Sequence, residues 1–310
     1  MQTHYQTTLK RSVTLTGIGL HKGHPARMVI RPAVADHGIW FKRTDVTSGD
    51  QLVPAAYDNV DNTTLCTRIA NADGVTVSTI EHVMAALAGL GVTNALIELD
   101  GPEVPIMDGS AAPFVERIQA VGLIRQDAQR LVIRILETVS LDEGEASARL
   151  EPADRFEMDY EIDFPDAVIG QQTRSMAVVN GAFVDHLSDS RTFCRQSDVD
   201  SLRANGLALG GSLENAIVVE DDRVVNPEGF RHADECVRHK MLDAVGDLAL
   251  AGAPIIGRYS GTRAGHGVTN RLIRKLFATP GAWRVEICAP EDAFGLPGAC
   301  ESEALGIAAE

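Results

Sequence analysis

Three ionisable side chains near the end of the chain recur at a spacing typical of one helix face. His239, Asp243 and Asp247 lie four positions apart, so a helix would align them. The residues between them are mostly apolar, which indicates burial, and a buried imidazole with two carboxylates is costly unless it is compensated. A divalent metal would compensate it, because a His and an Asp four residues apart can bind one ion. A core histidine hydrogen-bonded to either aspartate explains the same pattern without a metal.

Further candidates come from outside this segment. A catalytic zinc site usually has three protein ligands, and His82 follows Glu81 at the start of an apolar stretch. His82 could therefore bind the metal while Glu81 acts as general base on water. Alternatively, Glu81 only completes a capping box that begins at Ser78. His266 lies between two glycines, which allow close approach to a ligand; it could stabilise an oxyanion or protonate a leaving amine, oriented by Asp247, or be an ordinary turn histidine.

Two loops add weaker candidates. Thr192 follows a polar turn and could donate a hydrogen bond to an oxyanion. Asp108 begins the segment Asp-Gly-Ser, which is more typical of an N-cap and tight turn before a helix than of a catalytic group.

The composition narrows the function classes. The 310 residues include 28 basic and 43 acidic side chains, a net charge of −15, which argues against nucleic-acid binding. The five cysteines are scattered and form no C-x-x-C pair, as expected for free thiols in a reducing compartment. The N-terminus lacks an apolar signal region, and no run approaches the roughly 18 apolar residues of a membrane span. We expect a cytoplasmic protein, at most peripheral to the inner membrane.

The elements that must position these residues alternate in type along the chain. In the first part, strands are predicted at 8–16, 26–31, 38–43 and 95–99, and helices at 83–90 and 112–120. In the second part, strands are predicted at 131–140, 146–150, 156–162, 174–179, 216–219 and 254–259, and helices at 181–187, 197–205, 231–251 and 267–276. This order indicates an α+β protein of two similar domains, each a β-sheet layered with helices. Residues 126–130 are the candidate linker, and 279–310 are expected to be a poorly ordered tail.

Taken together, segments along nearly the whole chain resemble the UDP-3-O-acyl-N-acetylglucosamine deacetylases, the zinc enzymes of the committed step of bacterial lipid A synthesis. The resemblance runs from Thr8 to about residue 278 and is carried by Gly17–His21, Ser78–His82, Pro105–Phe114, Arg191–Phe193, Gly210–Ser212, Val237–Asp243 and Gly265–His266. It implies helices sandwiched between two sheets, with one domain at 1–127 and another at 128–278. An insert at about 194–219 would line a passage for the 3-O-acyl chain.

The resemblance also implies roles for the candidate residues. It assigns one Zn²⁺ to three ligands, His82, His239 and Asp243, although a His₂Asp donor set also accepts Fe²⁺. Glu81 would be the general base and His266 the general acid, oriented by Asp247. Thr192 would hydrogen-bond the tetrahedral oxyanion.

The substrate would meet a further set of residues. Those implied are Lys240 and Phe193 at the sugar head, Asp163 and Phe164 at the nucleotide, and Val199, Leu202, Ala208, Leu213 and Val218 along the acyl passage. Two positions depart from the family pattern. Cys194 stands where glycine is frequent, and Ala146 stands where some members have a basic residue.

Two other classes of function compete with this interpretation. A metal-dependent hydrolase of another substrate, such as a peptidase, is one, but the chain has no H-E-x-x-H segment. A non-catalytic protein that binds a sugar nucleotide or lipid is the other, but mere binding needs neither a base nor a metal. We expect a monomer that acts on the acylated UDP-sugar.

Overall fold

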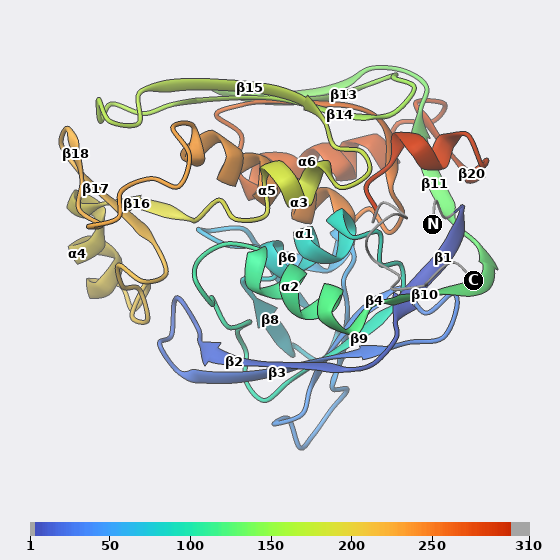
Figure 1. Ribbon diagram of the computed structural model, residues 1–310, viewed down its shortest axis with the longest axis horizontal. Coiled ribbons are helices and arrows are strands. Elements are labelled where there is room, and N and C mark those ends of the chain that lie inside the picture. The colour runs from blue at the N-terminus through green and yellow to red at the C-terminus, as the bar shows by residue number, and fades with distance from the viewer. Residues whose placement is uncertain (1–3, 299–310) are drawn as a thin grey trace, which may run out of the picture.

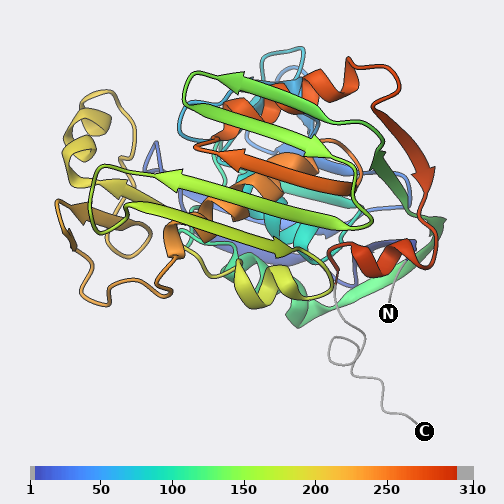
Figure 2. The same cartoon turned by 90° about the horizontal axis from the view of Figure 1, so that it is seen from above.

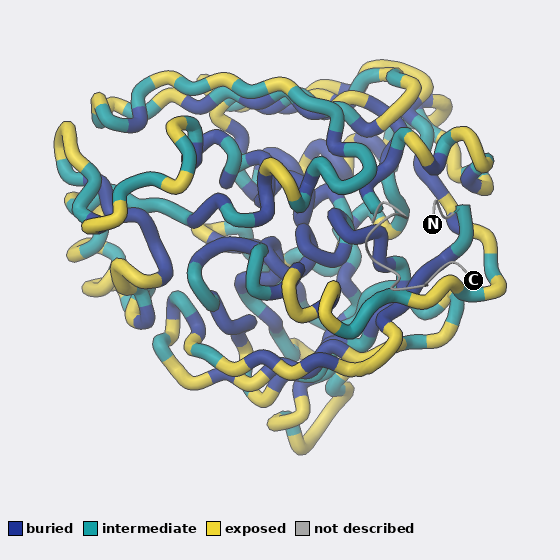
Figure 3. The backbone as a smooth tube through the Cα atoms, viewed as in Figure 1, coloured by how far each residue is buried: buried dark blue, intermediate teal, exposed yellow. Residues whose placement is uncertain are grey.

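Two large β-sheets enclose a layer of helices (Figure 1). The structure is a computed structural model that describes residues 4–298. Burial is concentrated in the middle layer, and exposed residues follow the outer strands and loops (Figure 3). This arrangement confirms the α+β prediction of sheets layered with helices.

The first sheet comes from the first part of the chain. Its strand order is β2-β3-β9-β4-β5, with bounds Val13–Ile18, Pro25–Pro32, Ala95–Leu99, Ile39–Arg43 and Leu52–Pro54. Burial alternates along β9, as expected when one face packs on the core. The helices that cover it are α1 (Glu81–Gly89) and α2 (Ala112–Val121). A 3-10 turn η1 (Tyr57–Asn59) leads into a small sheet of β6 (Val60–Asn62), β7 (Arg68–Ala70) and β8 (Thr76–Ser78).

The second sheet is built around one long strand. This is β19 (Ile255–Thr262), which pairs with β13, β14 and β11. The other members are β11 (Leu131–Ile135), β12 (Val139–Glu143), β13 (Ala146–Glu151), β14 (Phe156–Asp163), β15 (Gln171–Ala177) and β20 (Trp283–Ile287). Its helices are α3 (Ala182–His186), α5 (Glu235–Ala249) and α6 (His266–Phe277).

The predicted insert forms a separate small unit. It contains β16 (Phe193–Arg195), α4 (Gln196–Ala204), β17 (Ile217–Glu220) and β18 (Arg223–Val224). Figure 2 shows this unit at the end of the molecule opposite β20. Within residues 4–298, none of the helices has the length and apolar character needed to span a bilayer.

Helices α1 and α5 form the centre of the molecule and pack very closely. Nearly every residue of both helices is buried. A Cβ atom placed on Gly246 would lie 2.0 Å from the carbonyl oxygen of Glu81. Only glycine therefore permits this approach, which brings the start of α1 against the middle of α5.

Three local predictions are wrong. Residues 126–130 are not a loose linker, because β10 (Leu123–Gln129) pairs with β1 (Tyr5–Leu9), and the expected boundary at 127/128 falls inside β10. The expected disorder is absent from 279–298, where β20 pairs with β11 and a 3-10 turn η2 (Asp292–Gly295) follows. The abundance of Ala, Gly and Pro there concealed a five-residue strand. The rest of that tail, 299–310, lies outside the described residues.

The third wrong prediction concerns the start of α1. The N-cap residue is Ile80, and no side chain caps the helix. Ser78 belongs to β8, and the Glu81 side chain accepts a hydrogen bond from the backbone N–H of Thr67 rather than closing a capping box. The Glu81 carboxylate therefore does not cap the N-terminus of α1.

Candidate active site

Three donor atoms converge where α1 meets α5. His82 Nε2 and His239 Nε2 lie 3.5 and 3.4 Å from Asp243 Oδ1, and the three ligand atoms all lie within 4.8 Å of one another. All three residues are buried. Within residues 4–298, Asp243 Oδ1 has no hydrogen-bond partner, which is costly for a buried carboxylate oxygen. The group could hold a metal ion, and its two imidazoles and one carboxylate suit a divalent transition metal.

The protonation states of these side chains suit metal binding. The Nδ1 of His239 donates to the carbonyl oxygen of Ser190 at 3.0 Å, which leaves Nε2 free as a ligand atom. Burial lowers the pKa of His239 to about 3, so its ring is neutral. Burial alone would raise the pKa of Asp243, but His239 and Lys240 hold it well below its usual value. His239 and Asp243 are thus deprotonated without help from the metal.

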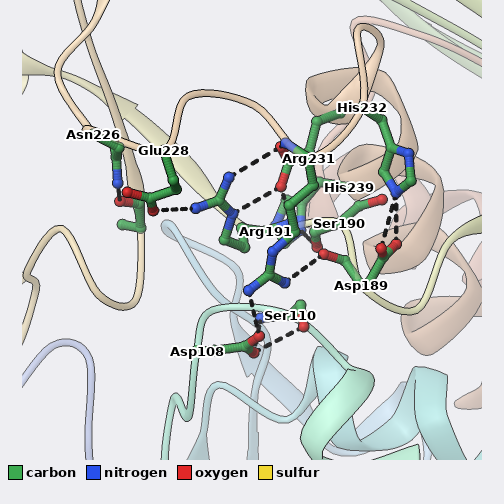
Figure 4. Close-up of polar contacts among 12 residues, drawn as sticks. Asp108, Ser110, Asp189, Ser190, Arg191, Asn226, Glu228, Arg231, His232 and His239 are labelled. Atoms are coloured by element: carbon green, nitrogen blue, oxygen red, sulfur yellow. Dashed lines mark hydrogen bonds and ion pairs between the residues drawn. The ribbon is translucent and has the colours of Figure 1, made fainter.

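A buried ion pair holds the loop that orients His239. Arg191 Nε donates to Glu235 Oε1 at 2.9 Å, and Arg191 Nη1 donates to Glu228 Oε1 at 2.6 Å. Figure 4 shows Ser190 beside His239, with Arg191 on the same loop directed at Glu228. Glu235 is the first residue of α5, so the helix that carries two ligand atoms also anchors the loop that fixes one of them.

A second chain of hydrogen bonds links the proposed acid and base. Thr67 donates its backbone N–H to Glu81 Oε2 at 3.0 Å and its hydroxyl to Asp247 Oδ1 at 2.6 Å. His266 Nδ1 lies 2.7 Å from Asp247 Oδ2. Both oxygens of Asp247 are therefore engaged, and the His266 ring is fixed with its Nε2 as the available atom. Thr67 was not predicted as a site residue, because it lies in a loop with no local motif.

Burial and neighbouring charge shift the pKa values of this pair in useful directions. Burial raises the pKa of Glu81, although His266 and His82 partly counter it. Burial alone would lower the pKa of His266, but the carboxylate of Asp247, helped by those of Glu81 and Asp243, raises it to about 9. The site therefore sets a carboxylate with raised proton affinity near an imidazolium ion, a combination typical of general acid–base catalysis.

The other predicted residues occupy different parts of the site. The Phe193 ring centroid lies 6.3 Å from that of His239 and 5.3 Å from that of Phe164, so Phe193 borders a metal ligand and Phe164 packs on Phe193. Lys240 donates to Asp243 Oδ2 at 2.6 Å. The Asp163 carboxylate pairs with Arg263 at the end of β14.

Thr192 is held by its backbone between two segments. Its N–H donates to the carbonyl oxygen of Gly109, and its own carbonyl oxygen accepts from Ile217, both at 2.8 Å. Gly109 has φ +83°, and a Cβ atom there would lie 2.1 Å from the carbonyl oxygen of Asn215. The Asp-Gly-Ser turn therefore supports the Thr192 loop. Asp108 itself pairs with Arg231 at 3.0 Å.

The proposed acyl-passage residues and the two positions that depart from the family pattern differ in how far they are buried. Among the proposed acyl-passage residues, Val218 is buried, Leu213 is exposed, and Val199, Leu202 and Ala208 are half-buried. The thiol of Cys194 in β16 has a pKa raised by burial, and Ala146 is half-buried at the start of β13.

His21 is a second residue near the site for which no role was predicted. His21 is buried, and within residues 4–298 neither ring nitrogen has a hydrogen-bond partner. Burial lowers its pKa, and the charge of His266 is close enough to contribute. Its backbone N–H donates to Glu103 Oε1 at 2.7 Å, and a Cβ on Gly19 would lie 2.4 Å from Glu103 Oε2. The Gly-Leu-His motif could have marked His21 as a candidate site residue, but only the fold shows that its imidazole lies near His266.

A buried His–His–Asp group beside a buried glutamate and an imidazolium is the arrangement found in the class of metal-dependent hydrolases. Comparison with known proteins narrows this class. The profile of the UDP-3-O-acyl N-acetylglycosamine deacetylase family (LpxC) matches residues 6–278.

Curated relatives agree with the family match. The UDP-3-O-acyl-N-acetylglucosamine deacetylase of Phenylobacterium zucineum (strain HLK1) is 50% identical over 287 residues, which cover 93% of this chain and 98% of that protein. Those of Shewanella pealeana and Shewanella piezotolerans are each 46% identical over 283 residues, covering 91% of this chain and 92% of theirs. The chain belongs to the UDP-3-O-acyl N-acetylglycosamine deacetylase family, as its sequence motifs predicted.

Proposed function

We propose that the chain hydrolyses the N-acetyl group of UDP-3-O-(3-hydroxyacyl)-N-acetylglucosamine. The products are acetate and UDP-3-O-(3-hydroxyacyl)-glucosamine, in the committed step of lipid A biosynthesis. Family membership over residues 6–278 supports the choice of substrate. The observation that carries the chemistry is the meeting of Glu81, the His–His–Asp group and His266 at one buried point.

The metal is proposed to be Zn²⁺, held by His82, His239 and Asp243; Fe²⁺ would suit the same donors. When bound, such an ion polarises the acyl carbonyl and lowers the pKa of water to about 7. Asp243 Oδ1 has no hydrogen-bond partner within residues 4–298, which supports this assignment because a bound ion would replace the hydration that this buried oxygen has lost.

The protein side chains then divide the proton transfers. Glu81 accepts the proton of the attacking water, and its raised pKa makes it a stronger base than an exposed carboxylate. His266 donates from Nε2 to the nitrogen of the leaving amine, and a pKa of about 9 keeps it protonated at neutral pH. Asp247 orients the ring through Nδ1, and Thr192 donates its hydroxyl to the oxyanion.

Substrate contacts follow the same layout. Phe193 and Lys240 would contact the sugar head, since both lie against the metal ligands. Phe164, packed on Phe193, and Asp163 beside it would contact the nucleotide. The insert at 194–219 would carry the acyl passage.

The organisation and location of the chain are proposed on related grounds. The elements before β10 supply Glu81 and His82, and those after it supply His239, Asp243 and His266, which supports two domains that close one site. Because one chain provides the whole site, a monomer is sufficient. The described cysteines are all free thiols, which supports a cytoplasmic location, at most peripheral to the inner membrane.

Metal analysis combined with an acetate-release assay tests the proposal. The purified protein should contain about one Zn²⁺ or Fe²⁺ per chain, and a chelator should abolish deacetylation of the acylated UDP-sugar until metal is restored. Metal-free protein that binds the UDP-sugar but never releases acetate would favour a binding protein. Hydrolysis of other amides, with the UDP-sugar left intact, would favour a different hydrolase.

A further inference from the structure

A cavity of about 480 Å³ lies at the C-terminal ends of α1 and α5. Its wall includes Leu87 and Ala88 from the last turn of α1 and Leu248 and Ala249 from the last turn of α5. The metal ligand His82 lies at the opposite end of α1. The volume falls within the range of small-molecule sites, roughly 300–1,000 Å³, and none of the residues assigned to the reaction lines it.

Most of the wall is apolar. Ile39 and Trp40 come from β4 of the first sheet, and Leu131, Phe156 and Ile255 come from strands of the second. The cavity is therefore walled by both sheets and by the two central helices, and it offers an apolar chain contacts on several sides.

One cation interrupts this apolar wall. Arg130 lines the cavity with only 6% of its surface exposed. Within residues 4–298 its Nε has no hydrogen-bond partner, and none of the ion pairs found there includes it. Burial lowers its pKa to about 10, so it is still charged at neutral pH. Its backbone N–H donates to the carbonyl oxygen of His4, and its carbonyl oxygen accepts from the N–H of Cys288.

The polar groups nearby do not neutralise Arg130. Asp36 is the carboxylate of the wall; it is exposed and accepts from Gln6 Nε2 at 2.6 Å. Asn94 uses its amide on Gln6 and Gln126. The C-terminal end of α1 is close, since a Cβ on Gly91 would lie 3.9 Å from Arg130 Nη1. A helix C-terminus favours a cation, but it does not supply the missing acceptor for Nε.

We propose that this cavity is a second ligand site, which takes an amphiphilic carboxylate. The carboxylate would accept from the two terminal nitrogens of Arg130, a planar two-point pairing that a guanidinium makes readily. The aliphatic chain would lie against Trp40, Leu87 and Leu248. A neutral chain of the same length would leave the buried cation without an anion.

Trp40 provides a local test of occupancy. The chain has two tryptophans, and Trp283 does not line the cavity, so Trp283→Phe leaves Trp40 as the only reporter. Titration with ω-bromodecanoate, whose bromine quenches tryptophan at short range, should quench Trp40 saturably. The neutral ω-bromodecanol should bind at least tenfold more weakly. Equal binding of acid and alcohol, or no saturable quenching, would overturn the proposal.

Variants at two points of the cavity separate binding from folding. In the Trp283→Phe background, Arg130→Gln should weaken ω-bromodecanoate binding roughly 10- to 100-fold, as expected for loss of a charge-assisted hydrogen bond, and Arg130→Lys should retain part of it. Ala88→Phe, which fills the apolar end and leaves the charge, should weaken binding at least tenfold. Should Arg130→Gln fail to fold, Arg130→Lys and Ala88→Phe decide; unchanged binding in both would contradict the site.

A chelator distinguishes this cavity from the metal centre. A carboxylate bound to the metal would be released by EDTA, whereas quenching of Trp40 should persist unchanged. Decanoate should also raise the Tm of the chelated wild-type protein and leave that of Arg130→Gln unchanged. Loss of Trp40 quenching on chelation would assign the ligand to the metal centre and overturn the second site.

Discussion

The two ends of the α1–α5 helix pair differ in whether their buried charges have partners of opposite charge. Around the start of α1, the buried charges lie close enough to shift one another's pKa values. They belong to Glu81, Asp243, Asp247 and His266. At the far end, Arg130 is equally buried, but no carboxylate among residues 4–298 pairs with it. Burial of a charged side chain therefore does not by itself identify its function. Charges with charged neighbours form the reaction centre, whereas the charge without a carboxylate partner lines a cavity that we propose binds an anion.

The largest expected effect comes from removing the base at the catalytic end. Glu81→Gln keeps an oxygen for the Thr67 N–H but cannot accept a proton, so kcat should fall by about 10²–10⁴-fold. Metal content, measured by elemental analysis, should stay the same. Full activity in this variant would remove Glu81 from the mechanism.

Breaking the paired charges that support the site should cost stability. Glu235→Gln removes the buried carboxylate partner of Arg191 and leaves the guanidinium paired with the more exposed Glu228, which should lower the free energy of unfolding by roughly 1–3 kcal/mol. Denaturant titration measures this change. Arg223→Gln is the matched control, since its ion pair with Glu220 is exposed and should contribute about 0–1 kcal/mol.

Asp247→Asn should uncouple the acid from its orienting carboxylate. The activity should fall roughly 10- to 100-fold, as for other groups that orient an active-site ring, and the pKa of His266, now about 9, should drop. The basic limb of the pH–rate profile should move to lower pH. A profile that keeps its wild-type basic limb would argue against His266 as the acid.

The same variant has a signature in stability. The pKa of folded His266 lies above its ordinary value of 6.5, so its contribution to stability is fully present below pH 6.5 and is lost as the pH rises through about 9. The wild-type advantage over Asp247→Asn in denaturant titrations should thus be larger at pH 6 than at pH 10. A constant difference would place the stabilisation elsewhere.

Disturbing the close packing of α1 and α5 should lower the stability of the protein by a moderate amount. Gly246→Ala would press a methyl group against the Glu81 carbonyl and should destabilise the protein by about 1–3 kcal/mol, together with a loss of activity. Gly101→Ala is the control, because a Cβ atom there meets no atom within 4 Å. Equal unfolding midpoints for the two variants would contradict the packing argument.

The smallest expected effect lies at the end of the helix pair that carries the cavity. Arg130→Met removes a buried charge that has no carboxylate partner to leave behind, so stability in the absence of ligand should be unchanged or slightly higher. Denaturant titration beside Glu235→Gln measures the contrast. If Arg130→Met loses as much stability as Glu235→Gln, the guanidinium is paired by α1 and the two ends do not differ.

Much of the architecture was predictable because it follows local pattern. The strand Ala95–Leu99 and the helices around Ala112–Val121 and Glu235–Ala249 appear where alternation and helical spacing predicted them. β20 was missed because its short alternation lies among Ala, Gly and Pro residues. β10 was missed because its polar composition suits a linker, and only pairing with β1 makes it a strand.

The sequence by itself determined the family, the α+β class and the identity of the candidate metal-binding and catalytic side chains, because spacing and motif are local properties of the chain. Only the tertiary structure decided how those side chains meet. The glycine at 246 lets α1 reach α5, Thr67 joins Glu81 to Asp247, and His21 lies near enough to His266 to feel its charge. The unpartnered charge of Arg130 likewise depends on which groups the fold excludes from its neighbourhood. The physical reason is that solvation and pairing of a buried charge depend on contacts between segments far apart in the chain.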